Sequence, residues 1–558
     1  MSPNSADSAL HSDPPGDASA LLAVDLRRFP WIRRLAADYA FNYEAVAPFF
    51  SGDPANSAAW ADAIRRTQAH RRQREVVGRI VLAQQERRGA PRAAVDAARL
   101  LTDTRTVAVV TGQQAGLFGG PLFTLLKALT ALKLAARVSR DHQVPAVAVF
   151  WIDAEDHDWD EVRSCTVLDS ALVPHDVSLP ARTGGGQLPV ASVALDATIE
   201  AALDQIAALL PPTEFTPAIL ADLRAAYVEG RGMADAFGRW LETVLGPRGL
   251  IVYDASDPAS KPIASDIFVS ELSRPGETAR LAAAAGAHLV SCGYHSQVQV
   301  HDDALALFRI ENGRRAIRVQ DGRLIVGDES LPHAALVQEA SERPASFSPN
   351  VLLRPIVQDT LFPTICYVAG PNELAYLGQL RPVYERFGVP MPLMYPRASA
   401  TLLDSAAMRF LTKYGLPIEA LQPQDESALN QLLQQQIPPS VDEAYVRAAQ
   451  AVDAGMQGLI EAIPALDATL AGAAQSTLTR MQHDLHTLHN KMINAAKRRD
   501  ETLRRQFLRT RALAFPGGHA QERAIGFVSF LNQYGSALID RLEDGLPLDL
   551  GHHWVVSV

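Results

Sequence analysis

The chain up to about residue 404 alternates short apolar runs with longer amphipathic stretches. The apolar runs occupy residues 107–110, 147–152, 249–254, 363–370 and 391–397. Between the first two runs, residues 122–138 place apolar side chains at spacings of three and four, which is typical of a helix. Strands that alternate with helices of this length predict a parallel sheet with helices on both faces. We therefore expect an α/β fold with a doubly wound parallel sheet.

Some segments depart from this alternation. Residues 31–101 have a helical pattern and precede the sheet. Residues 165–197 alternate apolar and polar side chains around the sequence Thr-Gly-Gly-Gly at 183–186, which predicts a strand-rich insertion or hairpin. Residues 288–331 alternate with the two-residue period of antiparallel strands and predict a small β insertion. Residues 372–387 predict one helix after the strand at 363–370.

Strand signals disappear beyond about Asp404, and a long helical stripe follows. The stripe consists of Leu478, Met481, Leu485, Leu488, Met492 and Ala495, and it resumes after a one-residue slip at Leu503 and Phe507. A seam of this length favours a coiled-coil arm over a helix lying on its own domain. Its partner is a helix around residues 456–470 in an antiparallel hairpin, or a second copy of the chain. Pro464 should kink or interrupt that helix.

These patterns divide the chain into four parts. We expect a disordered leader at 1–22, a core at 23–404 with a helical preface and insertions at about 165–200 and 285–345, a coiled-coil arm at 405–515, and a C-terminal segment at 516–558 that packs back on the core. The leader is rich in Ser, Ala, Pro and Asp and lacks the basic start and apolar centre of a secretory signal.

Composition narrows the functional classes. The net charge of −10 argues against nucleic acid as the main partner, because phosphate binding needs a basic face. No apolar run is long enough to span a membrane. The 3 cysteines are an odd, scattered set that suits a reducing cytoplasm. Cys292, His295 and His301 have spacing suited to a metal, but closed zinc sites usually combine two paired motifs, so we predict no metal site.

The first candidate site is the glycine-rich loop 112–120, which precedes the helix at 122–138. Unpaired N–H groups and the dipole at a helix N-terminus favour an anion. The candidate ligand contacts in this loop are Gln113, Gln114, Gly116 and Gly119. Two adjacent side-chain amides can donate to and accept from a polar substrate, and Lys127 can reach a phosphate or point to water. A tight turn without a ligand is the alternative.

The second candidate site is an acidic cluster at residues 153–161, directly after the strand at 147–152. Its candidate residues are Glu155, Asp156, His157 and Asp158. His157 beside two carboxylates suits a general base or a contact to an attacking amine, and a carboxylate can hold the Mg²⁺ that accompanies ATP. A solvated acidic start of a helix is the alternative, because the helix dipole favours acids there.

Further polar residues follow the later predicted strands. This third set comprises Asn350, Arg354, Gln358, Asp359, Asn372, Glu373, Tyr376 and Arg397. Arg354 is suited to two-pronged recognition of a carboxylate or phosphate. Taken singly, each of these residues is equally suited to a helix cap or an ion pair. All three sets follow strand ends, where α/β sheets bind small ligands.

Several motifs together resemble the cysteine-adding enzyme of bacillithiol biosynthesis, the BshC family of cysteine ligases. The matching motifs are Thr-Gly-Gln-Gln at 111–114, Gly-Leu-Phe at 116–118, Gly-Gly-Pro-Leu at 119–122, Phe-Trp-Ile at 150–152, Glu-Asp-His-Asp at 155–158, residues 350–359 and 367–376, Phe-Pro-Gly-Gly at 515–518 and Gln-Glu-Arg at 521–523. They span most of the chain in order. No HxGH motif, the usual nucleotide signature of nucleotidyl transferases, is present.

The resemblance implies a Rossmann-like core with connecting insertions and a C-terminal α-helical coiled coil that makes a homodimer. It also implies the last step of bacillithiol synthesis, in which the carboxyl group of cysteine is joined to the amine of glucosaminyl malate. Making an amide in water needs an activated acyl group, so ATP with Mg²⁺ is the expected cofactor. The expected partners are these two small molecules, with no nucleic acid and no membrane.

Roles for the candidate residues follow from that chemistry. Gln113, Gln114 and the glycine loop are expected to bind the sugar malate or the activated acyl group. His157 and Asp156 are expected near the amine, and Arg354 is expected to hold a carboxylate. A weaker hypothesis places the nucleotide near the end of the chain, at Gly517, Gly518, Gln521 and Arg523.

Two other functions remain open from the sequence. One is a nucleotidyltransferase-like enzyme that activates another acid. The other is a non-catalytic scaffold, in which the coiled coil recruits other proteins of the thiol pathway.

Overall fold

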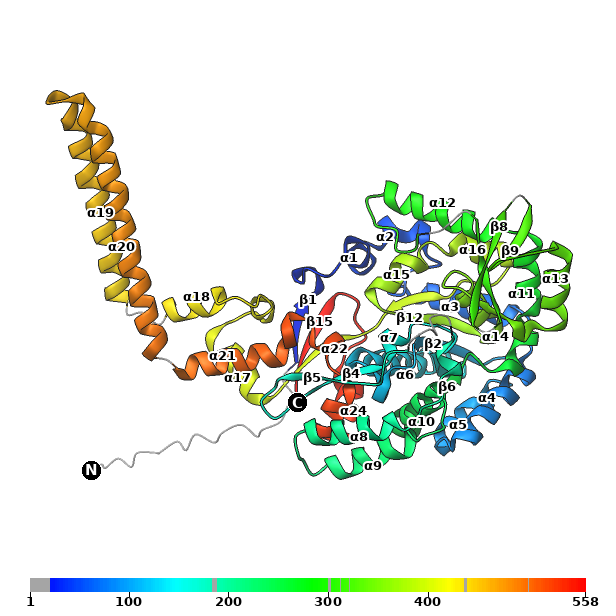
Figure 1. Ribbon diagram of the computed structural model, residues 1–558. Coiled ribbons are helices and arrows are strands. Elements are labelled where there is room, and N and C mark those ends of the chain that lie inside the picture. Colours follow the sequence, from blue (N-terminus) through cyan, green and yellow to red (C-terminus); the bar gives the residue numbers. More distant parts are fainter. Residues whose placement is uncertain are drawn as a thin grey trace, which may run out of the picture.

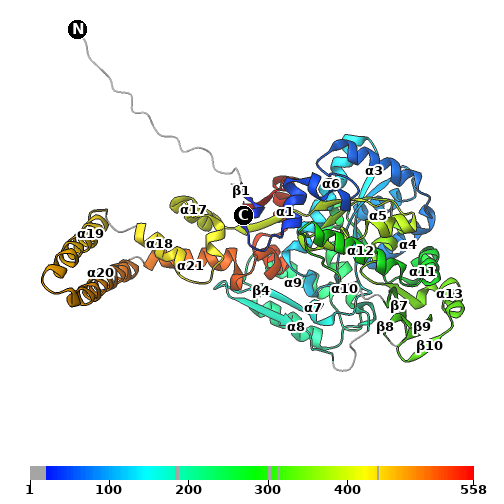
Figure 2. The same cartoon turned by 90° about the horizontal axis from the view of Figure 1, so that it is seen from above.

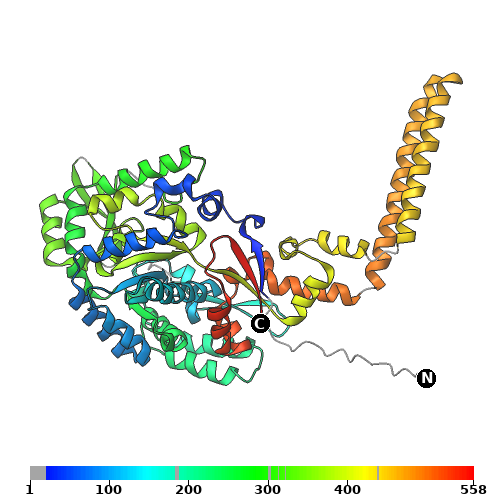
Figure 3. The ribbon, with the colours of Figure 1, turned by 180° about the vertical axis from the view of Figure 1, so that it is seen from behind.

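The computed structural model describes residues 21–182, 188–299, 303–311, 313–320, 322–435, 439–499 and 501–558. A rounded α/β body carries a long helical arm that projects from one side, as Figure 1 and the reverse view in Figure 3 show. None of the helices in these ranges is both long and apolar enough to cross a membrane.

A five-stranded parallel sheet forms the centre of the body, in the order β13-β12-β2-β3-β6. Its strands are β2 (Val107–Gln113), β3 (Ala146–Ile152), β6 (Ile251–Asp254), β12 (Thr364–Ala369) and β13 (Leu393–Pro396). The expected doubly wound α/β core is therefore confirmed, with the first βαβ unit at its middle.

Both faces of this sheet are buried, and side chains along its strands enter two different apolar layers. In β2, Val107 and Val109 pack in one layer, while Ala108 and Val110 pack in the other. The first layer includes α6 (Leu122–His142) and α10 (Met233–Leu245), and the second includes α4 (Arg74–Arg88) and α11 (Lys261–Ser273). This two-sided burial explains why the strands appear in the sequence as continuous apolar runs.

The helical preface and the helices around the sheet have the following bounds. They are α1 (Arg34–Phe41), α2 (Tyr43–Val46), α3 (Ser57–Ala69), α5 (Arg92–Leu100), α7 (Trp159–Val162), α8 (Thr198–Leu209), α9 (Thr216–Ala226), α12 (Glu277–Ser291), α13 (His333–Glu342), α14 (Arg354–Leu361), α15 (Pro371–Leu377) and α16 (Arg381–Phe387). The single helix expected at 372–387 is wrong, because Pro382 starts a new helix and separates α16 from α15.

The two insertions contain antiparallel strands. β4 (Ser164–Leu168) and β5 (Pro174–Ser178) form the first hairpin, which turns at residues 169–173. Residues 183–186, around which the sequence predicts the hairpin, lie outside the described residues. The second insertion is a sheet in the order β10-β9-β8-β7-β11. Its strands are β7 (Ala304–Ile310), β8 (Arg314–Gln320), β9 (Arg323–Val326), β10 (Glu329–Leu331) and β11 (Phe347–Pro349). Residues 288–291 end α12 and are not strand, since Ala282, Gly286 and Leu289 are buried at helical spacing.

A third sheet joins the two ends of the described chain to the core. It has the order β1-β15-β14, from β1 (Leu21–Asp25), β15 (His552–Ser557) and β14 (Ser399–Leu403). The expectation that no strand follows Asp404 is wrong, because β15 pairs with β1 on one side and β14 on the other. Leu21 and Leu22, the last residues of the expected leader, belong to β1.

The arm is an antiparallel pair of helices, α19 (Pro439–Ala462) and α20 (Ala471–Arg499), which Figures 1 and 2 show side by side. The expected partner helix at 456–470 is corrected, because α19 ends at Ala462. Pro464 lies in a short 3-10 turn and interrupts the helix as predicted. The other C-terminal helices are α17 (Ser405–Tyr414), α18 (Ser427–Gln435), α21 (Glu501–Ala514), α22 (Gln521–Ala524), α23 (Phe527–Tyr534) and α24 (Ala537–Gly545).

Candidate functional site

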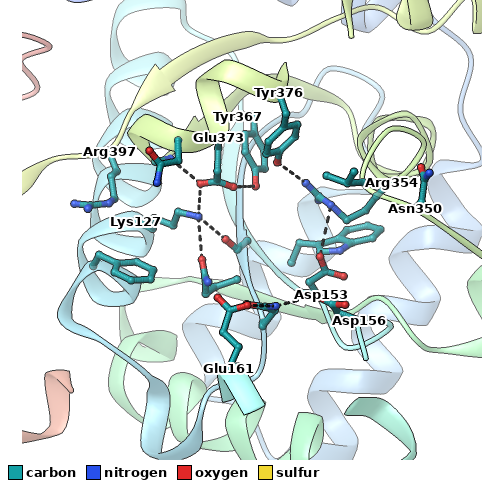
Figure 4. A pocket seen from close by; sticks show the side chains of 18 of the residues that line it. Lys127, Asp153, Asp156, Glu161, Asn350, Arg354, Tyr367, Glu373, Tyr376 and Arg397 are labelled. Atoms are coloured by element: carbon teal, nitrogen blue, oxygen red, sulfur yellow. Dashed lines mark hydrogen bonds and ion pairs between the residues drawn. The ribbon is translucent and has the colours of Figure 1, made fainter. Parts of the chain in front are cut away.

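A charged cavity of about 340 Å³ opens at the carboxyl ends of β2, β3, β12 and β13. Figure 4 shows its side chains converging from these strand ends, from α6 and from α15. The lining residues are Gly112, Gln113, Gln114, Phe123, Lys127, Trp151, Asp153, Asp156, Glu161, Arg314, Pro349, Asn350, Val351, Arg354, Tyr367, Gly370, Asn372, Glu373, Tyr376, Arg397 and Arg523. This edge of the sheet is where parallel α/β folds place ligands.

Lys127 of α6 is buried under the cavity and contacts three acceptors. Its Nζ donates to the Gly112 carbonyl at 2.8 Å and to Gln113 Oε1 at 3.1 Å, and it forms an ion pair with Glu373 Oε2 at 2.5 Å (Figure 4). Burial lowers the pKa of Lys127, and the nearby Glu373 carboxylate opposes that shift. The ammonium joins α6, β2 and α15 at the floor of the site.

Glu373 receives donors from three directions. The Tyr367 hydroxyl donates to Oε1 at 3.1 Å, and the Gly370 backbone N–H donates to Oε2 at 2.6 Å, beside the contact from Lys127. Although burial opposes it, the Lys127 ammonium lowers the pKa of Glu373 below its ordinary value. Glu373 is therefore an ionised carboxylate held by the structure.

Gln114 connects the two polar clusters expected from the sequence. Its Nε2 donates to Asp156 Oδ2 at 2.7 Å and to Glu161 Oε2 at 2.8 Å. The predicted convergence of the glutamine loop with the acidic cluster therefore occurs. Two carboxylates separated by one amide face the cavity, and this arrangement suits a positively charged ligand group.

Asp153 follows β3 and faces Arg354 across the cavity. The Arg354 Nε lies 3.7 Å from Asp153 Oδ2, and Arg354 also donates to Gln358 Oε1 at 3.2 Å and to the Tyr376 hydroxyl at 3.1 Å. Burial raises the pKa of Asp153 more than Arg354 lowers it. A carboxyl group in a cavity with a raised pKa is a candidate for proton transfer.

Arg314 reaches the site from the β insertion. It starts β8 and donates to Ser348 Oγ at 3.0 Å and to the Pro349 carbonyl at 2.8 Å. Its Nη1 lies 3.6 Å from Asp156 Oδ1. The insertion thus contributes a cation next to the carboxylates that Gln114 bridges.

The C-terminal segment contributes to the opposite wall. Arg397, which follows β13, forms a two-pronged contact with Glu522 of α22, at 2.9 Å from Nη1 to Oε2 and 2.6 Å from Nη2 to Oε1. The next residue, Arg523, lines the same cavity and forms no ion pair within the described ranges. Residues more than a hundred positions apart in the chain therefore share one wall.

Several residues expected at the site line this cavity. They are Gln113, Gln114, Asp156, Asn350, Arg354, Asn372, Glu373, Tyr376, Arg397 and Arg523. His157 is not brought into it: the imidazole is half exposed outside the lining, and Nδ1 lies 3.4 Å from Asp156. Asp158 instead caps α7 by accepting from the Glu161 N–H.

Two further expected contacts lie beneath the surface of the cavity. Glu155 is buried and pairs with Lys261, and Gln358 is buried between Arg354 and Asp359. Gln358 supports the lining residue Arg354, and neither side chain lines the cavity. Glu155 and Gln358 are polar because each pairs with another buried polar side chain.

The glycine loop does not form the expected anion cradle. The Leu122 N–H at the start of α6 donates to the Ile525 carbonyl at 2.8 Å, so the C-terminal segment occupies this helix terminus. Gly119 has φ of 99°, and a Cβ there would lie 2.3 Å from the Phe527 ring. Gly119 is thus required for close packing, and neither Gly116 nor Gly119 lines the cavity.

The weaker nucleotide candidates separate into two groups. Gly517 and Gly518 line another hollow of about 720 Å³, which Arg523 also borders. Gln521 is buried and exchanges hydrogen bonds with the Leu402 backbone, at 2.7 Å and 2.8 Å. Gln521 therefore holds the backbone of β14 and does not line the hollow that Gly517 and Gly518 border.

Among the charged and hydroxyl-bearing lining residues, the sequence reasoning did not choose Asp153, Glu161, Arg314 and Tyr367. Asp153 and Glu161 lie at the two ends of the acidic run and could have been chosen by their position after β3. Nothing near Arg314 in the sequence indicates a site, because its approach depends on how the insertion folds over the core. Among the described residues no cluster of His, Cys, Asp and Glu is arranged to hold a metal ion.

The fold and the cavity define a class: a Rossmann-like α/β protein with a charged small-molecule site at the ends of its parallel strands. Residues 23–398 match the family described as bacillithiol biosynthesis BshC, N-terminal Rossmann-like domain, and residues 400–558 match its C-terminal coiled-coil domain. The chain belongs to the BshC family of bacillithiol biosynthesis.

Whole-length relatives agree with this family. A protein of Salinibacter ruber named "Putative cysteine ligase BshC" is 34% identical and is aligned over 100% of both chains. Proteins with the same name from Koribacter versatilis and Symbiobacterium thermophilum are 34% and 33% identical. The alignment with the Koribacter versatilis protein covers 93% of this chain and 97% of that protein. The alignment with the Symbiobacterium thermophilum protein covers 83% of this chain and 86% of that protein. The family resemblance stated from the motifs is therefore confirmed.

Proposed function

We propose that this protein joins the carboxyl group of cysteine to the amine of glucosaminyl malate, forming the amide of bacillithiol in the last step of its synthesis. The observation that carries the proposal is the charge layout of the cavity. Carboxylates bridged by Gln114 lie on one side, and the guanidinium groups of Arg397 and Arg523 lie on another. An amino sugar that carries a dicarboxylic acid needs both kinds of partner.

The carboxylates are the proposed site of the amine. Asp156 and Glu161 accept from the same amide nitrogen and keep further lone pairs for an ammonium or amine of the ligand. His157 contacts Asp156 from outside the cavity, so we assign it a supporting role. Asn372 and the Tyr376 hydroxyl, with Arg397 and Arg523, line the part of the cavity that would receive the malate carboxylates.

Asp153 is the proposed general base. An amine must lose a proton as it attacks an activated acyl carbon, and a partly buried carboxylate with a raised pKa accepts that proton more readily than an ordinary aspartate. The Arg354 guanidinium lies next to Asp153 and would also steady the oxyanion of the acyl group.

ATP with Mg²⁺ is the proposed source of activation. A free carboxylate does not form an amide in water, and phosphorylation or adenylation of the cysteine carboxyl supplies a leaving group. The hollow that includes Gly517, Gly518 and His519 is the proposed nucleotide site, because Arg523 borders both it and the main cavity. The Arg523 guanidinium would then lie between the phosphates and the acyl group.

The arm is proposed to make a homodimer in the cytoplasm. Large apolar side chains are exposed along it, including Leu459 at 52%, Leu466 at 87% and Leu488 at 53% exposure. Burial against a second arm would remove this apolar surface from water. The cysteines Cys165, Cys292 and Cys366 are all free thiols, which agrees with a reducing compartment.

The test combines purified protein with cysteine, glucosaminyl malate, Mg²⁺ and ATP, and measures bacillithiol and the nucleotide product by mass spectrometry. We expect product only when both substrates and the nucleotide are present. Parallel reactions with GTP or without nucleotide identify the energy source. Product formed without any nucleotide would contradict the ATP proposal, and absence of bacillithiol under every condition would contradict the proposed function.

A further inference from the structure

The two adjacent glutamines of the cavity have opposite hydrogen-bonding polarity. A side-chain amide has one accepting end and one donating end, and its charged neighbours decide which end faces inward. Gln113 faces a buried ammonium, whereas Gln114 faces two carboxylates. The surroundings therefore determine what each amide offers to a ligand.

Lys127 sets the orientation of Gln113. An ammonium has three N–H donors and no acceptor, so the Gln113 atom directed at it must be Oε1. The three donors meet three acceptors: the Gly112 carbonyl, Gln113 Oε1 and Glu373 Oε2. Gln113 lines the cavity, and no described residue accepts a hydrogen bond from its Nε2. The amide N–H groups of Gln113 are left for a ligand.

Asp156 and Glu161 set the orientation of Gln114 in the opposite sense. Ionised carboxylates only accept, so the Gln114 atom between them must be Nε2. Asp156 also accepts the backbone N–H of His157 at 2.7 Å, which agrees with an acceptor at that position. The side-chain Oε1 of Gln114 has no donor among the described residues and is left for a ligand.

We propose that Lys127 is a positioning residue that makes Gln113 a donor for a carboxylate or carbonyl oxygen of one substrate, while Gln114 accepts from an amine or hydroxyl group of the other. This inference rests on the proposed function and deepens it. Consecutive residues offer one donor and one acceptor, so the acyl oxygen and the amine of the forming amide are held side by side. Lys127 itself lies beneath Gln113 and acts through that amide.

The polarity is tested with two probes that each carry one of the recognised groups. 3-Mercaptopropionate has the thiol and carboxylate of cysteine without the amine, and glucosamine has an amine and hydroxyl groups without a carboxylate. Calorimetry measures the binding of each to the full-length protein. The matched variants are Gln113→Met and Gln114→Met, which keep side-chain length and remove the amide.

We expect Gln113→Met to weaken 3-mercaptopropionate about tenfold or more, the usual loss for a hydrogen bond to a charged group. Its affinity for glucosamine should stay within about twofold, since the two contacts are separate. Gln114→Met should weaken the binding of glucosamine about tenfold or more and leave the affinity for 3-mercaptopropionate within about twofold. Equal weakening of both probes by either variant, or failure of both probes to bind the unaltered protein, would overturn the inference.

The role of Lys127 needs its own variant. Lys127→Met alone leaves the partly buried Glu373 carboxylate without its cation and can destabilise the fold. The double variant Lys127→Met with Glu373→Gln removes both charges, and a melting curve checks its fold. We expect it to bind 3-mercaptopropionate as poorly as Gln113→Met does and to bind glucosamine normally. A double variant that keeps full affinity for 3-mercaptopropionate would remove Lys127 from this role.

These outcomes separate the inference from the function on which it rests. Probe binding reports polarity without any turnover. If the probes discriminate as expected and the unaltered protein makes no bacillithiol, the function fails and the polarity stands. If bacillithiol forms and the probes do not discriminate, the polarity fails and the function stands.

Discussion

Arg397 and Glu522 form a buried ion pair, at 2.6 Å between Nη2 and Oε1, that joins the Rossmann-like region to the C-terminal region. Their side chains are 2% and 5% exposed. Glu522 also accepts from Ser399 Oγ and the Ala400 N–H, so its position is set from three directions. The cavity wall at Arg397 therefore depends on the C-terminal segment.

Glu522→Gln should destabilise the protein by about 3–5 kcal/mol, because it leaves the Arg397 guanidinium buried without a counter-charge. Urea unfolding measures the change. The control is Glu200→Gln, which alters an exposed pair with Arg224 and should cost less than about 1 kcal/mol. Equal effects of the two changes would show that the buried pair does not stabilise this junction.

His553 should make stability depend on pH. Burial is the main cause that lowers its pKa from 6.5 to about 4, and its ring nitrogens contact the hydroxyls of Ser399 and Thr401. Above pH 6.5 the ring is neutral in both the folded and the unfolded state. As the pH falls from 6.5 to about 4, the unfolded chain binds a proton that the folded chain rejects, so stability is lost in that window.

The expected loss is about 3 kcal/mol, from about 1.4 kcal/mol for each pKa unit. Urea midpoints between pH 7 and pH 4 measure it, and His553→Gln should flatten that part of the curve. His552→Gln on the same strand is the control, since that ring is 37% exposed and pairs with Asp549. An unchanged pH curve in His553→Gln would contradict this assignment.

Asp153→Asn should lower kcat by about 10²–10⁴, the usual contribution of a general base. Because the pKa of Asp153 is raised above 3.8, the acid limb of the rate profile should lie above that value. The limb should disappear in the variant. Asp160→Asn is the control, because that side chain is 77% exposed and pairs with Arg163. A normal kcat in Asp153→Asn would exclude Asp153 as the base.

Arg314→Met should raise KM about tenfold, the typical effect of losing a charged hydrogen bond in a site. The change removes the contacts to Ser348 and Pro349 and the cation beside Asp156. Steady-state kinetics measures the effect. Arg318→Met on the same strand is the control, because its side chain is 64% exposed. Similar kinetics for both variants would place Arg314 outside the binding surface.

Leu488→Glu should shift the proposed dimer to monomer at micromolar concentration, because it places a charge on the exposed apolar surface of the arm. Light scattering at several concentrations measures the mass. Val290→Glu is the control, since Val290 is 55% exposed on α12 of the core. A monomeric unaltered protein, or a dimer that survives Leu488→Glu, would contradict the proposed interface.

Sequence reasoning predicted the parallel core well, because both faces of each strand are buried and the strands therefore appear as apolar runs. It also brought Gln114 and Asp156 together, since adjacent strand ends must share an edge of the sheet. It failed at β15, a short strand with two histidines and a serine, whose pairing partners lie far away in the chain. Long-range pairing leaves little local signal.

The order of apolar and polar residues determined the βαβ core, the helical arm and the placement of polar side chains at strand ends, because these depend on local periodicity. Tertiary structure decided which of those side chains face the cavity. It turned His157 outward, covered the glycine loop with the C-terminal segment and brought in Arg314 and Arg523 from distant elements. Contacts between residues far apart in the chain arise from packing in three dimensions, which no local pattern encodes.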